Sequence, residues 1–348
     1  MYPPVYYSEY LQLDKILDAQ QPKSELYNVK ANDEMLFIVI HQTYELWFKQ
    51  ILFEVELVRQ IFCQEDIDDN KADLSNAVHR LHRVTQILEI LVGQITILET
   101  MTPLDFLDFR DFLRPASGFQ SIQFKILEAA LGLRYQDRFG HHYYLSQLSQ
   151  TDIDRVKEAE TKVSLLELLN QWLERMPFLQ NSKFWNTNSE ALQQVQTHPF
   201  WQQYRQTYIN GLLPSERNNQ QGFDLLLWND EQYPETRRLS PKANRHALFI
   251  MLYRDCPLLH APYQLLNTLL DIDDLLAQWR YRHINMVGRM IGKRIGTGGS
   301  TGADYLQSAA QSHYIFKELA ELTSYLVQRN HLPTLSSELQ RALGYVQW

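Results

Sequence analysis

The stretch DEMLFIVIHQTYELWFKQILFEVELVRQIFC, residues 33–63, carries apolar side chains at steps of three and four along its whole length. That spacing predicts an amphipathic α-helix, with Asp33 as its N-terminal cap. Residues 73–101 repeat the pattern. Both stretches exceed the average helix of a globular protein, so their apolar faces predict a helical bundle.

A shorter helix is predicted to follow. Thr102 can cap it, with Pro103 at the first helical position and Asp105 three residues after the cap. Pro115 is expected to stop it, because proline has no backbone N–H with which to continue the helical hydrogen bonds. The apolar face of this helix would hold Phe106, Phe109 and Leu113.

The later part of the chain has the same periodicity. Residues 151–212 predict further helices, and the pattern returns at residues 243–292, where we expect interruptions near Pro257 and Pro262. The intervening residues 214–241 are richer in Asn, Gln, Glu, Arg and Pro, and predict an excursion with no role beyond structure. Two more helices are expected to close the chain.

The fold class is predicted from the low glycine and proline content together with the helical periodicity of the apolar residues. The 348 residues include only 13 glycines and 13 prolines, and strand-like alternation of polar and apolar residues is hard to find. No internal repeat and no sharp change of composition divides the chain. The sequence therefore predicts an all-α protein, with residues 1–348 forming one helical-bundle domain that carries a small inserted helical region.

The charge balance narrows the possible partners. Lys+Arg 33 against Asp+Glu 41 gives a formal charge of -8, with basic residues scattered among acidic ones. This argues against nucleic acid and anionic membranes as partners. Cys63 and Cys256 match no metal or redox spacing and are expected to be buried or half-buried thiols. With no apolar segment near the start, we expect a cytoplasmic protein.

One histidine lies in an aromatic stripe of the first long helix. Phe37, His41, Tyr44 and Phe48 share a face at steps of four, three and four. His41 could be a core histidine bonded to a carbonyl, or an imidazole that projects into an aromatic-lined pocket. A metal pair with Glu45 is disfavoured, because the chain has neither the His-Glu-x-x-His nor the Glu-x-x-His motif of zinc and di-iron sites.

A second histidine lies in a late apolar stripe, formed by Leu276, Trp279, His283, Met286 and Met290. The stripe could be the buried face of a long helix and nothing more. It also suits haem, which needs one neutral imidazole as an axial ligand and apolar side chains around the macrocycle. In that case Trp279 and Met286 would contact the haem beside His283.

Two further features could bind an anionic group. Arg110 follows Phe106 by one helical turn, which suits a carboxylate bound beside an aromatic ring, although a surface ion pair is the ordinary role of such an arginine. The loop GTGGSTG, residues 296–302, lacks the ending of a phosphate-binding loop. It could still bring Thr297 to a ligand, or be a surface connector.

The chain resembles the tryptophan 2,3-dioxygenase family over nearly its whole length, in the ordered segments VYYSEYLQLDKILDAQ, HQTYELWFKQ, ILETMTPLDFLDFRDFLRPASGFQS, LLELLNQWLERMPF and WRYRHINMVGRMIGKRIGTGGSTG. The resemblance implies an all-α homotetramer with one b-type haem per chain. It further implies that O2 opens the indole C2–C3 bond of L-tryptophan to give N-formyl-L-kynurenine.

The resemblance also implies residue roles. His283 would be the proximal ligand of the haem iron, and His41 would lie on the distal side within reach of the indole N–H, as the catalytic residue. Phe37 and Phe106 would pack on the ring. The remaining pocket positions are implied to be Arg110 and Thr297 at the amino-acid end, Leu113 and Ser117 along the wall, and Tyr7 and Tyr10 from a neighbouring subunit.

Departures from the family pattern are small. Phe106 stands where some bacterial members have Tyr, and Lys125 stands where Arg is expected. Two alternatives keep the same fold. One is a haem monooxygenase acting on a modified indole or an aromatic amino acid, and the other is a non-catalytic sensor of haem or tryptophan.

Overall fold

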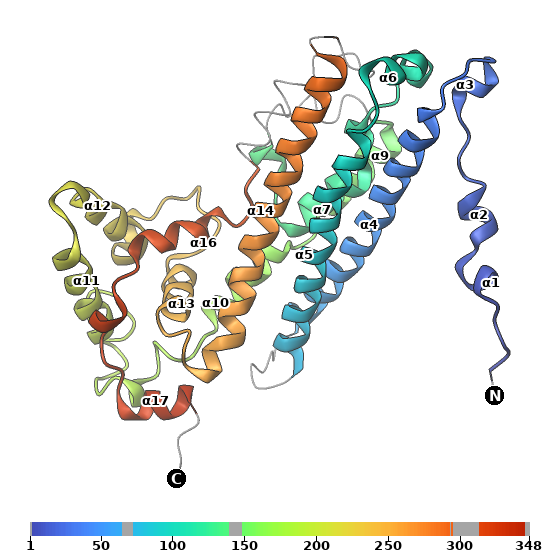
Figure 1. Cartoon of the computed structure of the whole chain (residues 1–348). Coiled ribbons are helices and arrows are strands. Elements are labelled where there is room, and N and C mark those ends of the chain that lie inside the picture. Colours follow the sequence, from blue (N-terminus) through green and yellow to red (C-terminus); the bar gives the residue numbers. More distant parts are fainter. Residues whose placement is uncertain (1, 65–71, 139–147, 293, 295–312, 345–348) are drawn as a thin grey trace.

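The main layer of the molecule is a set of long helices (Figure 1). The computed structural model describes residues 2–64, 72–138, 148–292, 294 and 313–344, and within these ranges it contains helices and no strand. The predicted all-α class is therefore confirmed there. The long helices are α4 (Asp33–Phe62), α5 (Ala72–Leu98) and α14 (Pro257–Ile291). Helix α5 packs against both others, and α4 runs opposite to them (Figure 1).

The helix boundaries test the capping predictions. Helix α4 begins at Asp33, so the cap position belongs to Asn32, whose side chain makes no capping hydrogen bond. The prediction that Asp33 caps this helix was wrong by one residue. The prediction that Thr102 caps the following short helix is confirmed. In α6 (Pro103–Arg110), Thr102 Oγ1 accepts from the Asp105 N–H at 3.3 Å, and the Asp105 carboxylate accepts from the Thr102 N–H at 3.0 Å.

Two prolines in the last long helical stretch have different effects. Helix α13 (Pro241–Leu252) ends before Pro257, which opens α14, so the interruption predicted there is confirmed. Pro262 lies inside α14, and the interruption predicted near it was wrong. Since Pro262 is only the sixth residue of the helix, it removes one hydrogen bond, to the Leu258 carbonyl, and leaves the following turns intact.

A second group of shorter helices lies largely on the side of α14 away from α4 (Figure 1), although its first member also packs against α4. It comprises α10 (Leu165–Glu174), α11 (Pro199–Gly211), α12 (Asn219–Phe223), α13, α16 (Lys317–Glu321) and α17 (Ser337–Leu343). The predicted excursion, residues 214–241, folds onto this group. Its Phe223 and Leu227 are fully buried, and Asp224 pairs with Arg205 through contacts of 2.6 and 2.8 Å.

One hydrophobic cluster joins the two groups of helices. It runs through the buried faces of α4, α5, α10, α13, α14 and α17, in residues such as Ile51, Leu91, Phe249, Leu276 and Leu339. By length and composition α5 could cross a membrane. Its buried residues nevertheless recur along the whole helix, and it packs between α4 and α14, as the core helix of a soluble bundle does.

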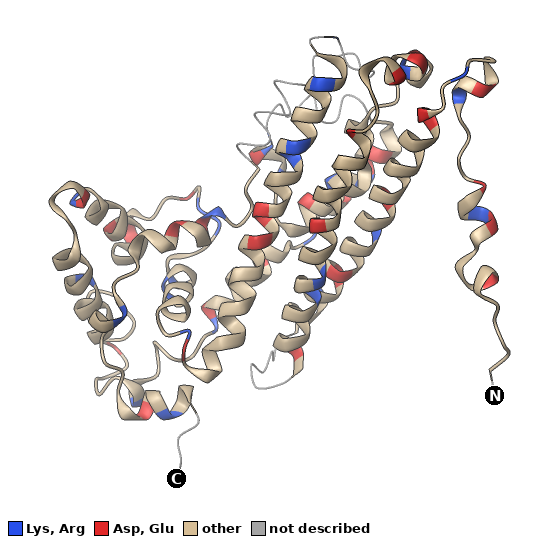
Figure 2. Ribbon diagram, viewed as in Figure 1, with Lys and Arg blue, Asp and Glu red and all other residues tan. Residues whose placement is uncertain are grey.

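The surface carries both signs of charge. Figure 2 marks acidic and basic residues interspersed along the ribbons of the long helices, as the sequence indicated. Of the two cysteines, Cys256 is half-buried but Cys63 is exposed, and neither is paired. The expectation that Cys63 is buried was wrong, because this residue directly follows the last turn of α4 and points away from the core.

A buried ion cluster ties α14 to α7 (Ile122–Leu131). One oxygen of Glu128 lies 2.5 Å from Arg138 Nη1, and the other lies 2.7 Å from Arg280 Nη2 and 3.6 Å from His313 Nδ1. Burial acts to raise the pKa of Glu128, but Arg138, His313 and Arg280 outweigh it and hold that pKa well below its usual value. Arg280 is three residues from His283, so the cluster restrains the part of α14 that carries this histidine.

The N-terminal segment stands apart from the bundle. Its helices are α1 (Tyr7–Leu11), α2 (Leu13–Leu17) and α3 (Lys23–Leu26), and neither α1 nor α2 contains a buried residue. Figure 1 shows α1 and α2 beside α4, separated from it. The attachment lies further along, where the Glu34 carboxylate accepts from the backbone N–H groups of Lys23 and Ser24 at 2.7 and 2.8 Å.

Candidate active site

The two histidines singled out in the sequence meet at one end of the bundle. His41 lies near the start of α4 and His283 near the end of α14, and α6 packs against both helices there (Figure 1). Burial, and after it the nearby His41, lowers the pKa of His283 to about 4. The two imidazoles are thus close enough to affect each other's charge, and we treat them as parts of one site.

The protonation state of His41 follows from its contacts. Its Nδ1 lies 2.7 Å from the Phe37 carbonyl oxygen, one helical turn earlier. A carbonyl can only accept, so Nδ1 carries the proton and donates it. Burial lowers the pKa of His41, although the bond to Phe37 and the charge of Glu45 act in the opposite direction. The ring is therefore neutral at neutral pH, and Nε2 presents a lone pair.

His283 is held by stacking. Its ring lies parallel to that of Trp279, at an interplanar angle of 6° and a centroid separation of 5.3 Å. Trp279 is fixed in turn by Phe124 at 5.0 Å and by Tyr44, edge to face, at 6.0 Å. Among the described residues His283 has no hydrogen-bond partner. A neutral imidazole with a free ring nitrogen is able to bind a metal.

These surroundings fit a haem. The neutral imidazole of His283 can supply the axial nitrogen, and Trp279 and the buried Met286 supply apolar surface on the same helix face. Within the described ranges there is no group of three or more His, Cys, Asp or Glu side chains that could hold a bare metal ion.

Aromatic rings form a wall next to His41. Phe37 lies 4.1 Å from the His41 ring, 5.8 Å from Phe106 and 5.6 Å from Phe109, measured between centroids. Phe106 and Phe109 contact each other edge to face at 5.4 Å. The predicted pocket residues Phe37 and Phe106 are thus brought together beside His41. Flat aromatic faces of this kind can pack against a planar ring.

Arg110 is next to this wall, in the last turn of α6. Its side chain is buried, at 5% exposure, which is unusual for an arginine and excludes an ordinary surface role. Leu113 is half-buried against the core one turn further on. Ser117 is half-buried and engaged locally, since its hydroxyl accepts from the Phe119 N–H at 3.4 Å and caps the short turn Gly118–Gln120.

Two predicted site residues, Tyr7 and Tyr10, are not brought to the site in this chain, and a third prediction cannot be compared with the structure. Thr297 lies outside the described residues. Tyr7 and Tyr10 are about three-quarters exposed on the N-terminal segment. The sequence in turn gave no sign of Phe124, which packs against Trp279, because a contact between residues so far apart in the chain leaves no local periodicity.

The fold and the site together define a class: an all-α protein whose two neutral histidines and aromatic wall suit a histidine-ligated porphyrin. Comparison with known proteins gives the family. The model of the tryptophan 2,3-dioxygenase family matches residues 3–326 of this sequence. The chain belongs to the tryptophan 2,3-dioxygenase family.

Relatives of the same name cover almost the whole chain. A tryptophan 2,3-dioxygenase of Bdellovibrio bacteriovorus is 41% identical over an alignment of 362 positions that covers 99% of each chain. One of Alteromonas mediterranea is 41% identical over 98% of each chain. One of Anopheles gambiae is 41% identical over 97% of this chain and 89% of its own length. The similarity therefore includes every element of the site described above.

Proposed function

We propose that this chain opens the indole C2–C3 bond of L-tryptophan with O2 and releases N-formyl-L-kynurenine, the first step of the kynurenine pathway. Family membership makes the chain an enzyme of tryptophan oxidation. The structural observation that carries the proposal is the pairing of two neutral histidines. His283 of α14 is available to an iron, and His41 of α4 presents a lone pair.

Haem b is the cofactor of the family; His283 would hold its iron, and the bound group would supply the chemistry of O2 activation. The protein's part on the proximal side is to hold the ligand. Parallel stacking on Trp279 limits the rotation of the His283 ring, and Met286 fills the next turn of the same face. The lowered pKa of His283 keeps its nitrogen unprotonated at neutral pH and able to bind iron.

The distal residues would orient the substrate. The His41 Nε2 lone pair accepts a hydrogen bond from the indole N–H, and Phe37 and Phe106 pack on the ring. This fixes the rotation of the indole, so that C2 and C3 face the site of O2 binding. We assign His41 this orienting role, because the single hydrogen bond accounts for its geometry without proton transfer.

The amino-acid end of tryptophan needs charged and polar partners. The buried guanidinium of Arg110 would bind the carboxylate through two parallel hydrogen bonds, and Thr297 would hold the carboxylate and ammonium from the glycine-rich loop. Leu113 and Ser117 would complete the wall. An arginine already desolvated in the fold interacts more strongly with a carboxylate than one on the surface does.

The oligomer is a further part of the proposal. One face of α4 carries exposed apolar side chains at steps of four and seven, namely Met35, Val39, Leu46 and Phe53, which are 40–58% exposed. On α5, Ile90 and Ile97 are each 50% exposed. Apolar faces of this extent are typical of contacts between subunits. We propose a homotetramer in which residues 1–30 contact a neighbour, and Tyr7 and Tyr10 reach its active site.

We also propose that residues 1–348 form one haem domain, since one hydrophobic cluster links α4 to α17. We place the protein in the cytoplasm, which agrees with two unpaired cysteines.

The deciding experiment follows the reaction itself. The haem-loaded protein is reduced without oxygen, supplied with L-tryptophan and then with O2, and the products are followed by ultraviolet absorbance and mass spectrometry. We expect N-formylkynurenine, with two added oxygen atoms, over many turnovers. One added oxygen atom would instead support the monooxygenase, and ligand binding without O2 consumption would support the sensor.

A further inference from the structure

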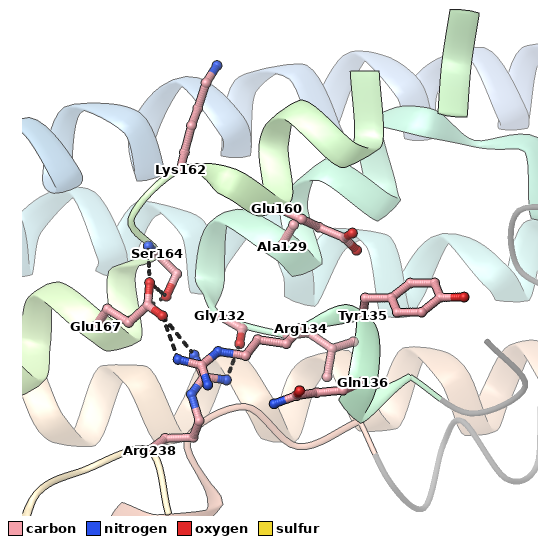
Figure 3. Close-up of a pocket in the computed structure, with 11 residues that line it drawn as sticks. Ala129, Gly132, Arg134, Tyr135, Gln136, Glu160, Lys162, Ser164, Glu167 and Arg238 are labelled. Atoms are coloured by element: carbon pink, nitrogen blue, oxygen red, sulfur yellow. Dashed lines mark hydrogen bonds and ion pairs between the residues drawn. The ribbon is translucent and has the colours of Figure 1, made fainter. Parts of the chain in front are cut away.

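A cavity of about 270 Å³ lies apart from the histidine site. It forms where α7 ends, where α10 begins, and where the chain approaches α13 (Figure 3). Its side chains include three cations against two carboxylates, and nothing in the proposed reaction uses them. The lining residues are Ala129, Gly132, Leu133, Arg134, Tyr135, Gln136, Glu160, Lys162, Ser164, Glu167 and Arg238.

Two guanidinium groups converge inside this cavity. Figure 3 shows Arg134 and Arg238 side by side next to the Glu167 carboxylate. Arg134 Nη2 lies 2.7 Å from Glu167 Oε1, whereas Arg238 Nη2 lies 3.6 Å from that same oxygen. One carboxylate oxygen is thus shared between two positive groups, and only Arg134 is within hydrogen-bonding distance of it.

Arg238 keeps unused donors although it is almost buried. Its Nη1 donates to the Gly132 carbonyl at 2.7 Å and to Asp137 Oδ2 at 3.4 Å, but Nε and Nη2 are buried and have no hydrogen-bond partner among the described residues. Its side chain is 11% exposed. Buried donors of this kind are rare in native proteins, because each costs the free energy of its lost hydration. Together Nε and Nη2 form the edge of a guanidinium that binds two oxygen atoms of one anion.

The neighbouring carboxylates make their hydrogen bonds elsewhere, and none of those in the described ranges lies within hydrogen-bonding distance of Nε or Nη2. Glu167 Oε2 is held by the N–H of Ser164 at 2.9 Å and by its hydroxyl at 3.0 Å, as part of the cap of α10. Glu160 is turned toward Arg138, with Oε1 3.3 Å from Nε. Burial, and after it the charge of Arg134, lowers the pKa of Arg238, although Glu167, Asp137 and Glu318 act in the opposite direction.

The position of Arg238 is fixed by the backbone beneath it. Gly132 ends α7 with φ +140°, and a Cβ at this residue would lie 2.8 Å from the Leu166 Cβ. No side chain fits there, so the carbonyl that accepts from Arg238 stays close against α10. The backbone N–H of Arg238 donates to Glu318 at 2.8 Å and holds the residue from the other side. The backbone around Arg238 is therefore held in place before a ligand arrives, while the buried Nε and Nη2 reach the cavity only by a rotation of the side chain.

We propose that this cavity binds a small oxyanion, a carboxylate or a phosphate, through the Nε and Nη2 edge of Arg238 with Arg134 beside it. The volume lies below the ~300–1,000 Å³ of pockets for drug-sized ligands, so the ligand is a small ion. The site is separate from the haem pocket, and the inference does not depend on the oxidation of tryptophan. Because the cavity joins α7, α10 and the segment before α13, a bound anion would also stabilise the fold.

Calorimetric titration of the haem-loaded protein tests this proposal. Sodium phosphate and sodium succinate are titrated separately at an ionic strength held constant with sodium chloride, so that the two sources of oxyanion are compared directly. We expect saturable binding of at least one ion, weakened about tenfold or more in Arg238→Gln. Arg134→Gln, at a more exposed position, should weaken binding by less.

The matched control is Arg245→Gln. The Arg245 side chain is also 11% exposed, but its two terminal nitrogens are paired with Asp230 at 2.6 and 3.0 Å, and it lies outside the cavity. Binding should be unchanged in this variant. If Arg238→Gln does not fold, Arg238→Lys keeps the charge and should still lose affinity through loss of the planar edge. Unchanged affinity in the Arg238 variants, or the absence of saturable binding of both ions, would overturn the proposal.

Discussion

Replacing Glu128 with glutamine removes the one negative charge that lies between two buried arginines. The side chains of Glu128, Arg138 and Arg280 are 5%, 1% and 7% exposed, so solvent cannot replace the lost charge. Removing one partner of a buried ion pair typically costs about 3–5 kcal/mol. The amide oxygen of glutamine can still accept from one guanidinium, so we expect a loss near 3 kcal/mol in the free energy of unfolding.

Urea unfolding of the haem-free chain, followed by circular dichroism at one protein concentration, measures this loss. Glu158→Gln is the control, since Glu158 pairs with Lys162 at 3.0 Å on the surface, where the two side chains are 68% and 56% exposed. That change should cost less than about 1 kcal/mol. A loss below about 1 kcal/mol in Glu128→Gln as well would refute the reasoning, because the cluster would then contribute no more than a surface pair.

The same substitution should change the response to acid. The pKa of Glu128 in the folded chain is held well below the usual 4.5. Its stabilisation is therefore present above the pKa of the unfolded chain and is lost as the pH falls through the folded-state value. Between these limits the stability of the wild-type chain should fall with decreasing pH, and Glu128→Gln should reduce that dependence. Equal slopes in the two proteins would contradict the assignment.

Four further predictions concern single histidines and Arg110. His283→Ala should abolish tight haem binding, measured by the Soret absorbance after gel filtration, while the apoprotein keeps its helical content. His41→Phe should leave haem in place and raise the KM for L-tryptophan about tenfold, the effect of one hydrogen bond, so an unchanged KM would count against the orienting role. Arg110→Gln should lower kcat/KM for L-tryptophan about 10- to 100-fold, and should have little effect on an indole that lacks the carboxylate. Burial lowers the pKa of His246 from 6.5 to about 4, so the unfolded chain takes up the proton first, and stability falls as the pH drops across that window. His246→Gln should remove about 3 kcal/mol of this acid dependence, measured by urea unfolding at pH 7 and pH 4.

The helices were predictable where the signal is local. The apolar periodicity of residues 33–63 gave α4 to within one residue, and the Thr102 capping motif gave the start of α6. The two wrong predictions, the cap of α4 and the interruption at Pro262, concern alternatives that differ by one position or by one hydrogen bond. Either Asn32 or Asp33 could cap a helix, and a proline as close to the helix start as Pro262 is tolerated.

The site was only partly predictable from the residues alone. A single imidazole within each apolar stripe identified His41 and His283 as candidates, but spacing cannot show that α4 and α14 bring them together at one end of the bundle. The same holds for the Glu128–Arg280 pair, whose members are 152 residues apart. Contacts at such separations depend on tertiary packing and leave no periodic trace in the sequence.

The hydrogen bond that His41 Nδ1–H donates within α4 determines which ligands can bind against the His41 ring. A neutral imidazole has a single N–H, and here it points at the Phe37 carbonyl, so only a lone pair faces outward. An indole meets that lone pair with a donor. A benzofuran or benzothiophene of nearly the same outline would meet it with a second lone pair, and repulsion would replace attraction. By fixing the tautomer of His41, the backbone of α4 thereby discriminates between ligands of equal shape according to whether one ring atom donates a hydrogen bond.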